Sequence, residues 1–296
     1  MEVSLMNNFI SVIIPTSCRS IDMLNNAVQS VKNQSMSVDE IIIVDDNNCN
    51  SLSENILLYC QENNLTYVAS GNVGAAAARN VGINIAHGTY IAFLDDDDIW
   101  FSNKLLMQMP LFSGSNVGLV YSRGYTVKIN DNGSTIQMPY STDRYYKTEI
   151  QYKDLLEKNY IGTTSQLVVK KSVLMQIKGF DKSLPSRQDY DLCLRIARHY
   201  RCLGVDDYLF LHNIHGGVQI TANSNINMKG YQLLFKKYKS DIYQIKDAPR
   251  KWCYRITHHA LASKSYAVFI KYLFLAIIYN PFKVKETIKK CFEKDK

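Results

Sequence analysis

The sequence predicts an α/β protein whose mostly parallel central sheet is covered by helices on both faces. Three observations lead to this fold class. Short apolar runs alternate along the first hundred residues with segments whose apolar residues recur at helical spacing. The apolar runs show no alternation with polar residues, which is typical of strands buried on both faces. The composition, with 46% hydrophobic and 21% charged residues in 296, excludes disordered, collagen-like and disulfide-scaffold proteins.

The first part of the chain supplies strands and helices in strict alternation. The strands are expected at 9–15, 40–44, 65–69 and 90–94. The helices are expected at 23–31, 52–60, 74–86 and 103–109. Because crossovers between parallel strands are right-handed, this order builds a sandwich of the nucleotide-binding type.

The pattern changes after residue 110, where the elements become shorter. Strands are expected at 117–121, 125–128, 135–138, 166–169, 201–205 and 209–214, and helices at 150–156, 171–178 and 189–200. The tetrapeptide Asn130–Gly133 is a typical hairpin turn between two of these strands. We place a boundary near residue 225, where a helical and basic extension, 226–296, begins.

Charge is distributed unevenly between these two parts. From Met228 to Lys296 the chain has 16 Lys and Arg against 5 Asp and Glu, a net charge of +11, whereas the first 227 residues carry −4. A strongly basic region suggests a polyanionic partner. The apolar stretch 266–282 is interrupted by Lys271 and Pro281 and is too short to span a bilayer, but it could lie in a membrane surface. The alternatives are packing on the preceding domain and a nucleic-acid patch; we expect the membrane surface and no nucleic acid.

The cysteines and the N-terminus indicate a compartment. The seven cysteines are scattered and form no CxxC motif, so neither a zinc site nor a disulfide framework is expected. Residues 1–8 lack the basic and apolar regions of a signal peptide. We therefore expect a cytoplasmic protein, peripheral at the inner face of the cell membrane.

Aspartates directly follow two of the predicted strands. Asp45 and Asp46 come after the strand at 40–44, and four consecutive aspartates, 95–98, come after the strand at 90–94. In an open parallel sheet, ligands bind beyond the carboxyl ends of the strands. Four adjacent carboxylates repel one another unless they are solvated or share a divalent cation. A solvated surface loop is the alternative, but the position beside a buried strand favours a metal–nucleotide site.

Five segments together carry a resemblance to a known family. They are SVIIPT at 11–16, EIIIVDDNN at 40–48, the stretch NVGAAAARNVGINIAHGTYIAFLDDDDIW at 72–100, and GFDKSLPSRQDYDLCLRIA at 179–197 followed by HNIHGGVQIT at 212–221. In order and spacing they resemble the inverting family 2 glycosyltransferases of the GT-A fold, of the bacterial surface-polysaccharide type. The resemblance covers 9–221. It implies a GT-A catalytic domain at 1–225, with a nucleotide-binding half at 1–100 and an acceptor half at 101–225.

The resemblance assigns the donor nucleotide to residues at the strand ends. They are Pro15, Thr16, Ser17, Asp46, Asn72, Gly74, Arg79, Asp95 and Asp96. It implies that Asp46 accepts a hydrogen bond from a base such as uracil. Gly74 allows close backbone approach. Arg79 either faces the diphosphate or pairs with an acid, and Asp95 or Asp96 holds ribose or metal-bound water.

The resemblance also implies a divalent metal, Mn²⁺ or Mg²⁺, since carboxylates, diphosphate and water suit hard ions. Asp97 is the expected ligand, and the ion would neutralise the leaving nucleoside diphosphate. His215 precedes two glycines that suit a mobile loop and is a second candidate ligand, although a structural histidine is the alternative. Asp98 is expected to cap a helix or to support the other aspartates.

An inverting transfer needs a general base for the acceptor hydroxyl. Members of the family usually carry Glu-Asp where this chain has Gln188-Asp189, so the departure leaves Asp189 as the base. A helix N-cap is the alternative role for an aspartate at this position, and Asp191 is the alternative base.

The implied reaction moves a hexose from a nucleotide diphosphate sugar, a UDP-sugar, to a hydroxyl of a glycan or of a polyprenyl-diphosphate-linked sugar, in O-antigen or capsule synthesis. One alternative is a sugar-phosphate nucleotidyltransferase, which would carry a glycine-rich loop where this chain has PTSCRS at 15–20. The other is a non-catalytic sugar- or lipid-binding scaffold of the same fold.

Overall fold

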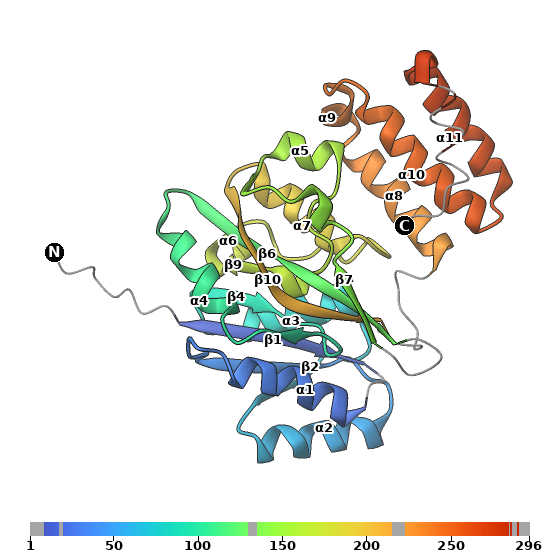
Figure 1. Cartoon of the computed structure of the whole chain (residues 1–296). Helices are drawn as coiled ribbons and strands as arrows, with labels where there is room; N and C mark the ends of the chain where they lie inside the picture. Colours follow the sequence, from blue (N-terminus) through green and yellow to red (C-terminus); the bar gives the residue numbers. More distant parts are fainter. Residues whose placement is uncertain are drawn as a thin grey trace. The chain divides into compact units, whose positions relative to one another are not determined.

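The computed structural model describes residues 9–17, 20–129, 135–214, 223–283, 285 and 289. The chain divides into two units that interleave along the sequence (Figure 1). Unit 1 comprises Met1–Gln151, Tyr160–Asp181 and Arg195–His215. Unit 2 comprises Tyr152–Asn159, Lys182–Leu194 and Gly216–Lys296.

One mixed sheet forms the centre of unit 1. Its strands in the described residues are β1 (Ile10–Thr16), β2 (Glu40–Asp45), β3 (Thr66–Ala69), β4 (Tyr90–Phe93), β5 (Ile99–Trp100), β6 (Val117–Ile129), β7 (Thr135–Pro139), β8 (Glu149–Ile150), β9 (Val168–Lys170) and β10 (Arg201–Ile214). Their order is β3-β2-β1-β4-β9-β6-β10-β5, with β7 beside β6 and β8 beside β10. The first four strands are mutually parallel, as predicted, and so are β6 and β10. β9 runs antiparallel between β4 and β6.

Helices cover both faces of this sheet. The helices that lie wholly in unit 1 are α1 (Ile21–Lys32), α2 (Asn50–Glu62), α3 (Ala75–Ile85), α4 (Lys104–Gln108) and α6 (Lys171–Gln176). On one face, Val12 and Ile14 of β1 share a core with Val28 of α1 and with α2. On the opposite face α3 approaches closely through Gly82, where an added Cβ would lie 2.6 Å from Ile13 Cγ2. The alternation of apolar runs and helical stripes therefore predicted the layers correctly.

Two predicted strands prove to be one. The segments 201–205 and 209–214 belong to the single strand β10, whose pairing with β6 shifts register between Val205 and Tyr208. Asp206 and Asp207 lie inside that irregularity, which lets two charged residues interrupt the apolar pattern without ending the strand. The two strands of the predicted hairpin, 125–128 and 135–138, pair antiparallel as parts of β6 and β7, whereas its turn, Asn130–Gly133, lies outside the described residues.

Unit 2 is helical and has an aromatic core. It contains α5 (Tyr152–Glu157), α8 (Ser224–Lys237), α9 (Lys239–Tyr243), α10 (Ala248–Ala262) and α11 (Tyr266–Tyr279), and it also holds the first residues of α7 (Gln188–Ala197). Trp252 is fully buried. Its indole N–H donates to the carbonyl of Leu156 at 2.6 Å, and its ring stacks on Tyr190 with 5.7 Å between centroids.

These aromatic contacts explain why the units do not follow a linear boundary. We expected the helical extension to begin near residue 225, but the segments 152–159 and 182–194 join it in unit 2. Both supply surface that covers Trp252, and no local sequence pattern announces such a long-range partner. Among the described residues, no helix combines the length and the apolar character needed to cross a bilayer.

Candidate active site

The site is built at the carboxyl ends of β1, β2 and β4. Asp46 follows β2, and its carboxylate accepts three hydrogen bonds from one loop. Its Oδ1 accepts from Ser70 Oγ at 2.6 Å and from the Val73 N–H at 2.7 Å. Its Oδ2 accepts from the Gly74 N–H at 2.9 Å. The structure therefore places Asp46 as the residue that fixes the loop before α3.

The conformation of this loop explains its sequence. Gly71, Asn72 and Gly74 all have positive φ angles, of 83°, 58° and 87°. Glycine adopts this region without strain, and asparagine is among the residues that tolerate it best. Gly74 is also the N-cap of α3, so its conformation turns the chain into the helix.

The end of β1 is joined to the same place. The Asp46 N–H donates to the Thr16 carbonyl at 2.9 Å, and Ser17 Oγ donates to the Asp46 carbonyl at 3.2 Å. Thr16 is buried, and its hydroxyl makes no hydrogen bond within the described chain. Thr16 and Ser17 thus lie next to Asp46, and Pro15 pairs with Val44 of β2.

Asp95, the first of the four consecutive aspartates, is held by a cation and two hydroxyls. Arg79 of α3 pairs with Asp95 Oδ1 at 2.5 Å. Thr164 Oγ1 donates to the same oxygen at 3.1 Å, and Thr163 Oγ1 donates to Oδ2 at 3.3 Å. Burial by itself raises the pKa of Asp95, but Arg79 and these hydrogen bonds bring the pKa below its ordinary value. Of the two roles left open for Arg79, the structure shows the pair with an acid.

Asp98, the last of the four, is fully buried. Its Oδ2 accepts from Ser165 Oγ at 2.6 Å, and its Oδ1 accepts from His212 Nδ1 at 3.0 Å and from the Asn213 N–H at 3.2 Å. Burial raises the pKa of Asp98, and the negative charges of Asp95 and Asp97 raise it further. Asp98 is not a helix N-cap, because β5 follows it directly. Its hydrogen bonds to His212 and Asn213 instead hold the end of the aspartate loop in place.

Ser165 connects the two ends of the acidic loop. Its Oγ donates to Asp98 and also accepts from the Asp95 N–H at 3.1 Å. Sequence reasoning missed Ser165, Thr163, Thr164 and His212. The available signal was the run of small hydroxyl residues in GTTSQ at 162–166, which lies some 70 positions beyond the aspartates.

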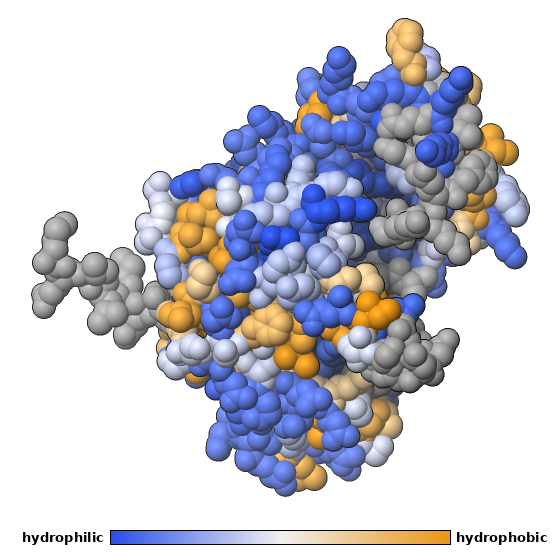
Figure 2. All heavy atoms as spheres, viewed as in Figure 1, coloured by the Kyte–Doolittle hydropathy of each residue, from blue (hydrophilic) through white to orange (hydrophobic). Residues whose placement is uncertain are grey.

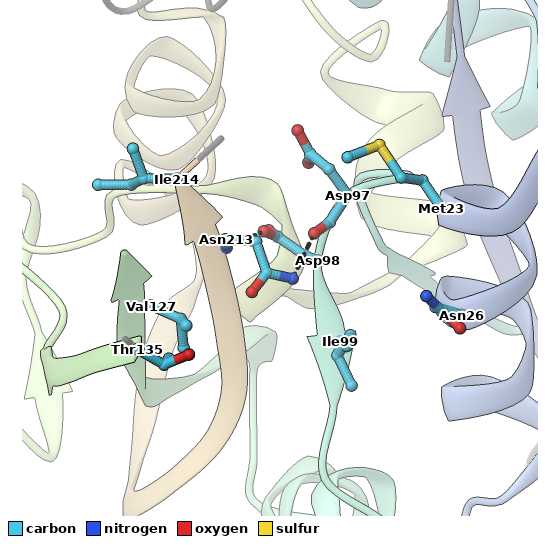
Figure 3. Close-up of a pocket in the computed structure, with 9 residues that line it drawn as sticks. All are labelled: Met23, Asn26, Asp97, Asp98, Ile99, Val127, Thr135, Asn213 and Ile214. Atoms are coloured by element: carbon cyan, nitrogen blue, oxygen red, sulfur yellow. Dashed lines mark hydrogen bonds between the residues drawn. The ribbon is translucent and has the colours of Figure 1, made fainter. Parts of the chain in front are cut away.

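Asp96 and Asp97 lie between these two anchored residues. Asp96 is buried, and Asp97 is partly exposed and lines a cavity of about 220 Å³. The cavity is lined by Met23, Asn26, Asp97, Asp98, Ile99, Val127, Thr135, Asn213 and Ile214 (Figure 3). Asn213 Nδ2 donates to the Asp97 carbonyl at 2.7 Å, which fixes the backbone of Asp97 at the cavity wall.

The donor set suits an ion that is shared with a substrate. Within the described residues, no three or more His, Cys, Asp or Glu side chains surround one point. Asp97 nevertheless offers hard carboxylate oxygen at a cavity, and a magnesium-like ion commonly binds through one or two carboxylates plus substrate phosphates. His215 lies outside the described residues.

The two candidate bases both lie in unit 2, in the first turn of α7, but their surroundings differ. Asp191 is fully buried, accepts from the Tyr238 hydroxyl at 2.8 Å and pairs with Lys237 at 2.7 Å. Asp189 is only partly buried. Asp191 thus ties α7 to α8 within unit 2.

Comparison with known proteins agrees with this geometry. The profile of glycosyl transferase family 2 matches residues 11–177. The chain is 30% identical over 269 residues to WcaA of Escherichia coli K12, a glycosyl transferase assigned to colanic acid biosynthesis, with 83% of this chain and 91% of that protein covered. It is 27% identical over 193 residues to the Escherichia coli UDP-Glc:α-D-GlcNAc-diphosphoundecaprenol β-1,3-glucosyltransferase WfgD, covering 65% and 72%. Two rickettsial relatives are longer, and the chain spans 38% of their length.

Solved structures show the same fold. TarS 1–349 of S. aureus, in complex with UDP-GlcNAc, has a TM-score of 0.64 at 16% identity, covering 94% of this chain and 83% of that chain. The mannosyltransferase PcManGT of Pyrobaculum calidifontis, in complex with GDP-Man and Mn²⁺, has a TM-score of 0.62 at 15% identity, covering 95% and 85%. The fold is that of the GT-A glycosyltransferases, and this chain is a glycosyltransferase that belongs to family 2.

Proposed function

We propose that the chain transfers a hexose from a UDP-sugar to a sugar hydroxyl, with inversion, in the synthesis of a bacterial surface polysaccharide. The observation that carries the proposal is that Asp46 and the acidic loop 95–98 follow parallel strands and lie at the same edge of the sheet, in a family 2 chain. The names of WcaA and WfgD support the polysaccharide context, and the UDP-sugars named for WfgD and TarS support the donor class.

The donor nucleotide would occupy the strand ends. Thr16 offers a buried hydroxyl that has no hydrogen-bond partner among the described residues, and such a group is stabilised when a ligand supplies its hydrogen bond. Asp46 holds the loop 71–74, so that the backbone beside Gly74 can approach a nucleotide. Asp46 contributes by shaping this surface, with a lone pair left for the base imide.

Asp97 would hold a divalent ion together with the donor diphosphate, supported by Asp96. When bound, the ion would neutralise charge on the departing nucleoside diphosphate. The Mn²⁺ in the PcManGT complex supports this assignment. Arg79 does not face the diphosphate in this proposal, because it neutralises Asp95. That pair keeps one carboxylate of the cluster charged without requiring the metal.

Asp189 is the proposed general base. The acceptor oxygen forms a bond to the anomeric carbon while the bond from that carbon to the diphosphate oxygen breaks on the opposite face. The acceptor proton passes to the Asp189 carboxylate. Asp191 is the weaker candidate, since its carboxylate is buried and already binds Lys237 and Tyr238. The burial of Asp191 and its two partners therefore support Asp189 as the proposed base.

The acceptor is proposed to be a sugar on a polyprenyl diphosphate, as the name of WfgD states for that enzyme. Such an acceptor is embedded in a membrane. The strongly basic C-terminal region is the proposed contact with that membrane surface, because anionic lipids attract clustered lysines.

A nucleotide binding screen tests the donor and the metal together. UDP, GDP, CDP and dTDP are titrated by calorimetry with and without Mn²⁺. We expect UDP to bind, and to bind more tightly with the metal, and we expect Asp97→Asn to lose the metal dependence. If only GDP bound tightly, the donor would be a GDP-sugar and the UDP-sugar assignment would be wrong. If the wild type bound UDP equally well with and without Mn²⁺, the role of Asp97 would be refuted.

A matched pair of variants tests the base. Asp189→Asn should reduce transfer by about a thousandfold while UDP affinity and unfolding are unchanged. Asp191→Asn should instead lower stability, because a buried charged pair is broken. Wild-type turnover by Asp189→Asn would refute the assignment.

A further inference from the structure

The outer face of α11 is apolar along its whole length. Tyr266, Ile270, Phe274 and Ile278 have 60%, 65%, 63% and 54% of their surface exposed. They follow one another at intervals of four residues, so they share one side of the helix. Phe282, just beyond the helix, is 99% exposed. Apolar side chains reach the surface over this part of the chain in Figure 2.

The inner face of α11 is apolar as well and packs within unit 2. Ala276 is fully buried, Tyr272 meets Phe235 of α8 edge to face at 6.4 Å, and Tyr279 meets Tyr243 at 5.4 Å. A helix that is apolar on all sides is normally enclosed by protein or by lipid. The inner face of α11 packs against other helices of unit 2. No described residue covers the outer face.

The helix is fastened so that this face stays outside. Asp247, before α10, accepts from Arg250 at 2.6 Å, from Asn280 at 3.0 Å and from Lys283 at 3.3 Å. These bonds tie the end of α11 to the beginning of α10. The open apolar face is therefore a fixed feature of unit 2.

The charged residues of the stretch from Lys264 to Lys285, which includes α11, are all basic. Lys264, Lys271, Lys283 and Lys285 are exposed, and no Asp or Glu occurs between Lys264 and Lys285. Lysine at such positions can keep its stem on an apolar surface while its ammonium group reaches anionic headgroups. Lys271 lies in the middle of the helix, so a symmetric pairing of two copies through this face would bring like charges together.

The length of α11 fixes how it can meet lipid. Its 14 residues span about 21 Å, less than the roughly 30 Å of a bilayer core. The helix can therefore lie along the surface with one side immersed. Tyr266, at the beginning of the helix, is of the kind that prefers the boundary between water and lipid.

We propose that α11 is an in-plane membrane anchor, whose face Tyr266–Ile270–Phe274–Ile278 enters the headgroup boundary of an anionic bilayer between flanking lysines. The proposal rests on the proposed function in one respect, the lipid-linked acceptor that gives the anchor its purpose. It names the part of the basic region that touches the membrane. The other lysines of unit 2 contribute to membrane binding only through their attraction to anionic lipids.

Flotation of the full-length protein with vesicles tests the proposal. Vesicles of phosphatidylcholine alone are compared with vesicles that also contain phosphatidylglycerol. We expect binding to the anionic vesicles, and a loss of at least about tenfold for the variant Ile270→Ser/Phe274→Ser/Ile278→Ser. Lys264→Gln/Lys271→Gln should lose about fivefold per lysine on anionic vesicles only.

A matched control removes apolar side chains of equal exposure elsewhere. Leu58, Leu106 and Met175 of unit 1 are 55%, 47% and 51% exposed, and their triple serine variant should bind vesicles like the wild type. Circular dichroism spectra of all variants are compared with that of the wild type to check that each variant is folded. Equal vesicle binding by the α11 variant and the wild type would overturn the proposal. A wild-type dimer in light scattering that the α11 variant dissociates would overturn it too, in favour of a second copy.

UDP binding separates this proposal from the proposed function. We expect the α11 variant to bind UDP like the wild type. If no form of the protein bound a nucleotide while vesicle binding followed the pattern above, the donor assignment would fail and the anchor would stand.

Discussion

Unit 1 and unit 2 hold their buried carboxylates in different ways. Unit 1 gathers four aspartates in one loop and fixes two of them, largely with neutral groups: Asp95 with Arg79 and threonine hydroxyls, Asp98 with Ser165, an amide and His212. Unit 2 scatters its aspartates and pairs two of them with basic residues, Asp191 with Lys237 and Asp247 with Arg250. In unit 2 charge is cancelled to join helices, whereas the loop in unit 1 keeps negative charge at a cavity.

We expect the largest effect on stability from removal of the ion pair between Arg79 and Asp95 in the acidic loop. Arg79→Ala leaves the Asp95 carboxylate, which is only 28% exposed, beside like charges without its cation, so we expect the free energy of unfolding to fall by about 3 kcal/mol. Urea denaturation measures it. The matched control is Arg201→Ala, which removes an exposed pair with Glu149 and should cost at most about 1 kcal/mol. If the two variants lost the same free energy of unfolding, the prediction that the less exposed ion pair contributes more would be wrong.

A carboxylate of unit 1 away from the acidic loop gives a pH dependence. Burial raises the pKa of Asp143 to about 6, in spite of the Gly124 N–H and Arg123 beside it. The folded state therefore holds this proton more tightly than the unfolded state, and stability is lost as pH rises from about 4 to 6, by up to about 3 kcal/mol. Asp143→Asn should flatten this slope, measured with the fluorescence of Trp100 in a Trp252→Phe background. An unchanged slope would contradict the assignment.

Ser165→Ala sharpens the claim that hydroxyls organise the acidic loop. The fully buried Asp98 loses its shortest hydrogen bond, so we expect a loss of about 2 kcal/mol. The affinity for UDP with Mn²⁺ should fall as well, because Asp95 loses a contact through its N–H. Ser113→Ala is the control, since that hydroxyl binds only an exposed carbonyl. Nucleotide affinity equal to that of the control would show that Ser165 does not position the aspartates.

The smallest expected effect lies in unit 2 and has the opposite sign with pH. Hydrogen bonds from Arg250 and Asn280, with the charge of Arg250, hold the pKa of Asp247 well below its usual range. The stability that Asp247 contributes is complete above pH 4 and is lost as pH falls below that value. Asp247→Asn should cost about 1 kcal/mol at neutral pH and nothing in strong acid. Trp252 fluorescence in a Trp100→Phe background measures it, and an equal cost at both pH values would contradict it.

The sequence predicted the regular layers of unit 1 because local patterns determine them. β1, β2, β3 and β4 lie within a few residues of the expected apolar runs, and α1 to α3 follow the helical stripes. The strand-end aspartates were also found, since a carboxylate run after a buried strand is a local signal. What local patterns could not supply were the partners of those aspartates. Ser165 and His212 lie 67 and 114 positions from Asp98.

Two further differences between the predicted and the observed fold also arise from contacts between residues that are distant in the sequence. Asp206 and Asp207 interrupt an apolar run, and only the pairing with β6 shows that one strand continues through them. The segments 152–159 and 182–194 join unit 2 through Trp252, which lies far along the chain. For Arg79 the sequence left two roles open, and a side-chain distance decided between them.

The strand order of unit 1 has a consequence for how the protein is made. β1 to β4 are neighbours in the sheet and are complete by Phe93, so a chain still on the ribosome can pair them through short crossovers. β6 lies next to β9 and β10, which begin about 40 and 70 residues after β6 ends, so its sheet neighbours are synthesised last. We expect pulse-labelled hydrogen exchange to protect the first four strands before β6. The nucleotide half would then serve as the template on which the later strands assemble.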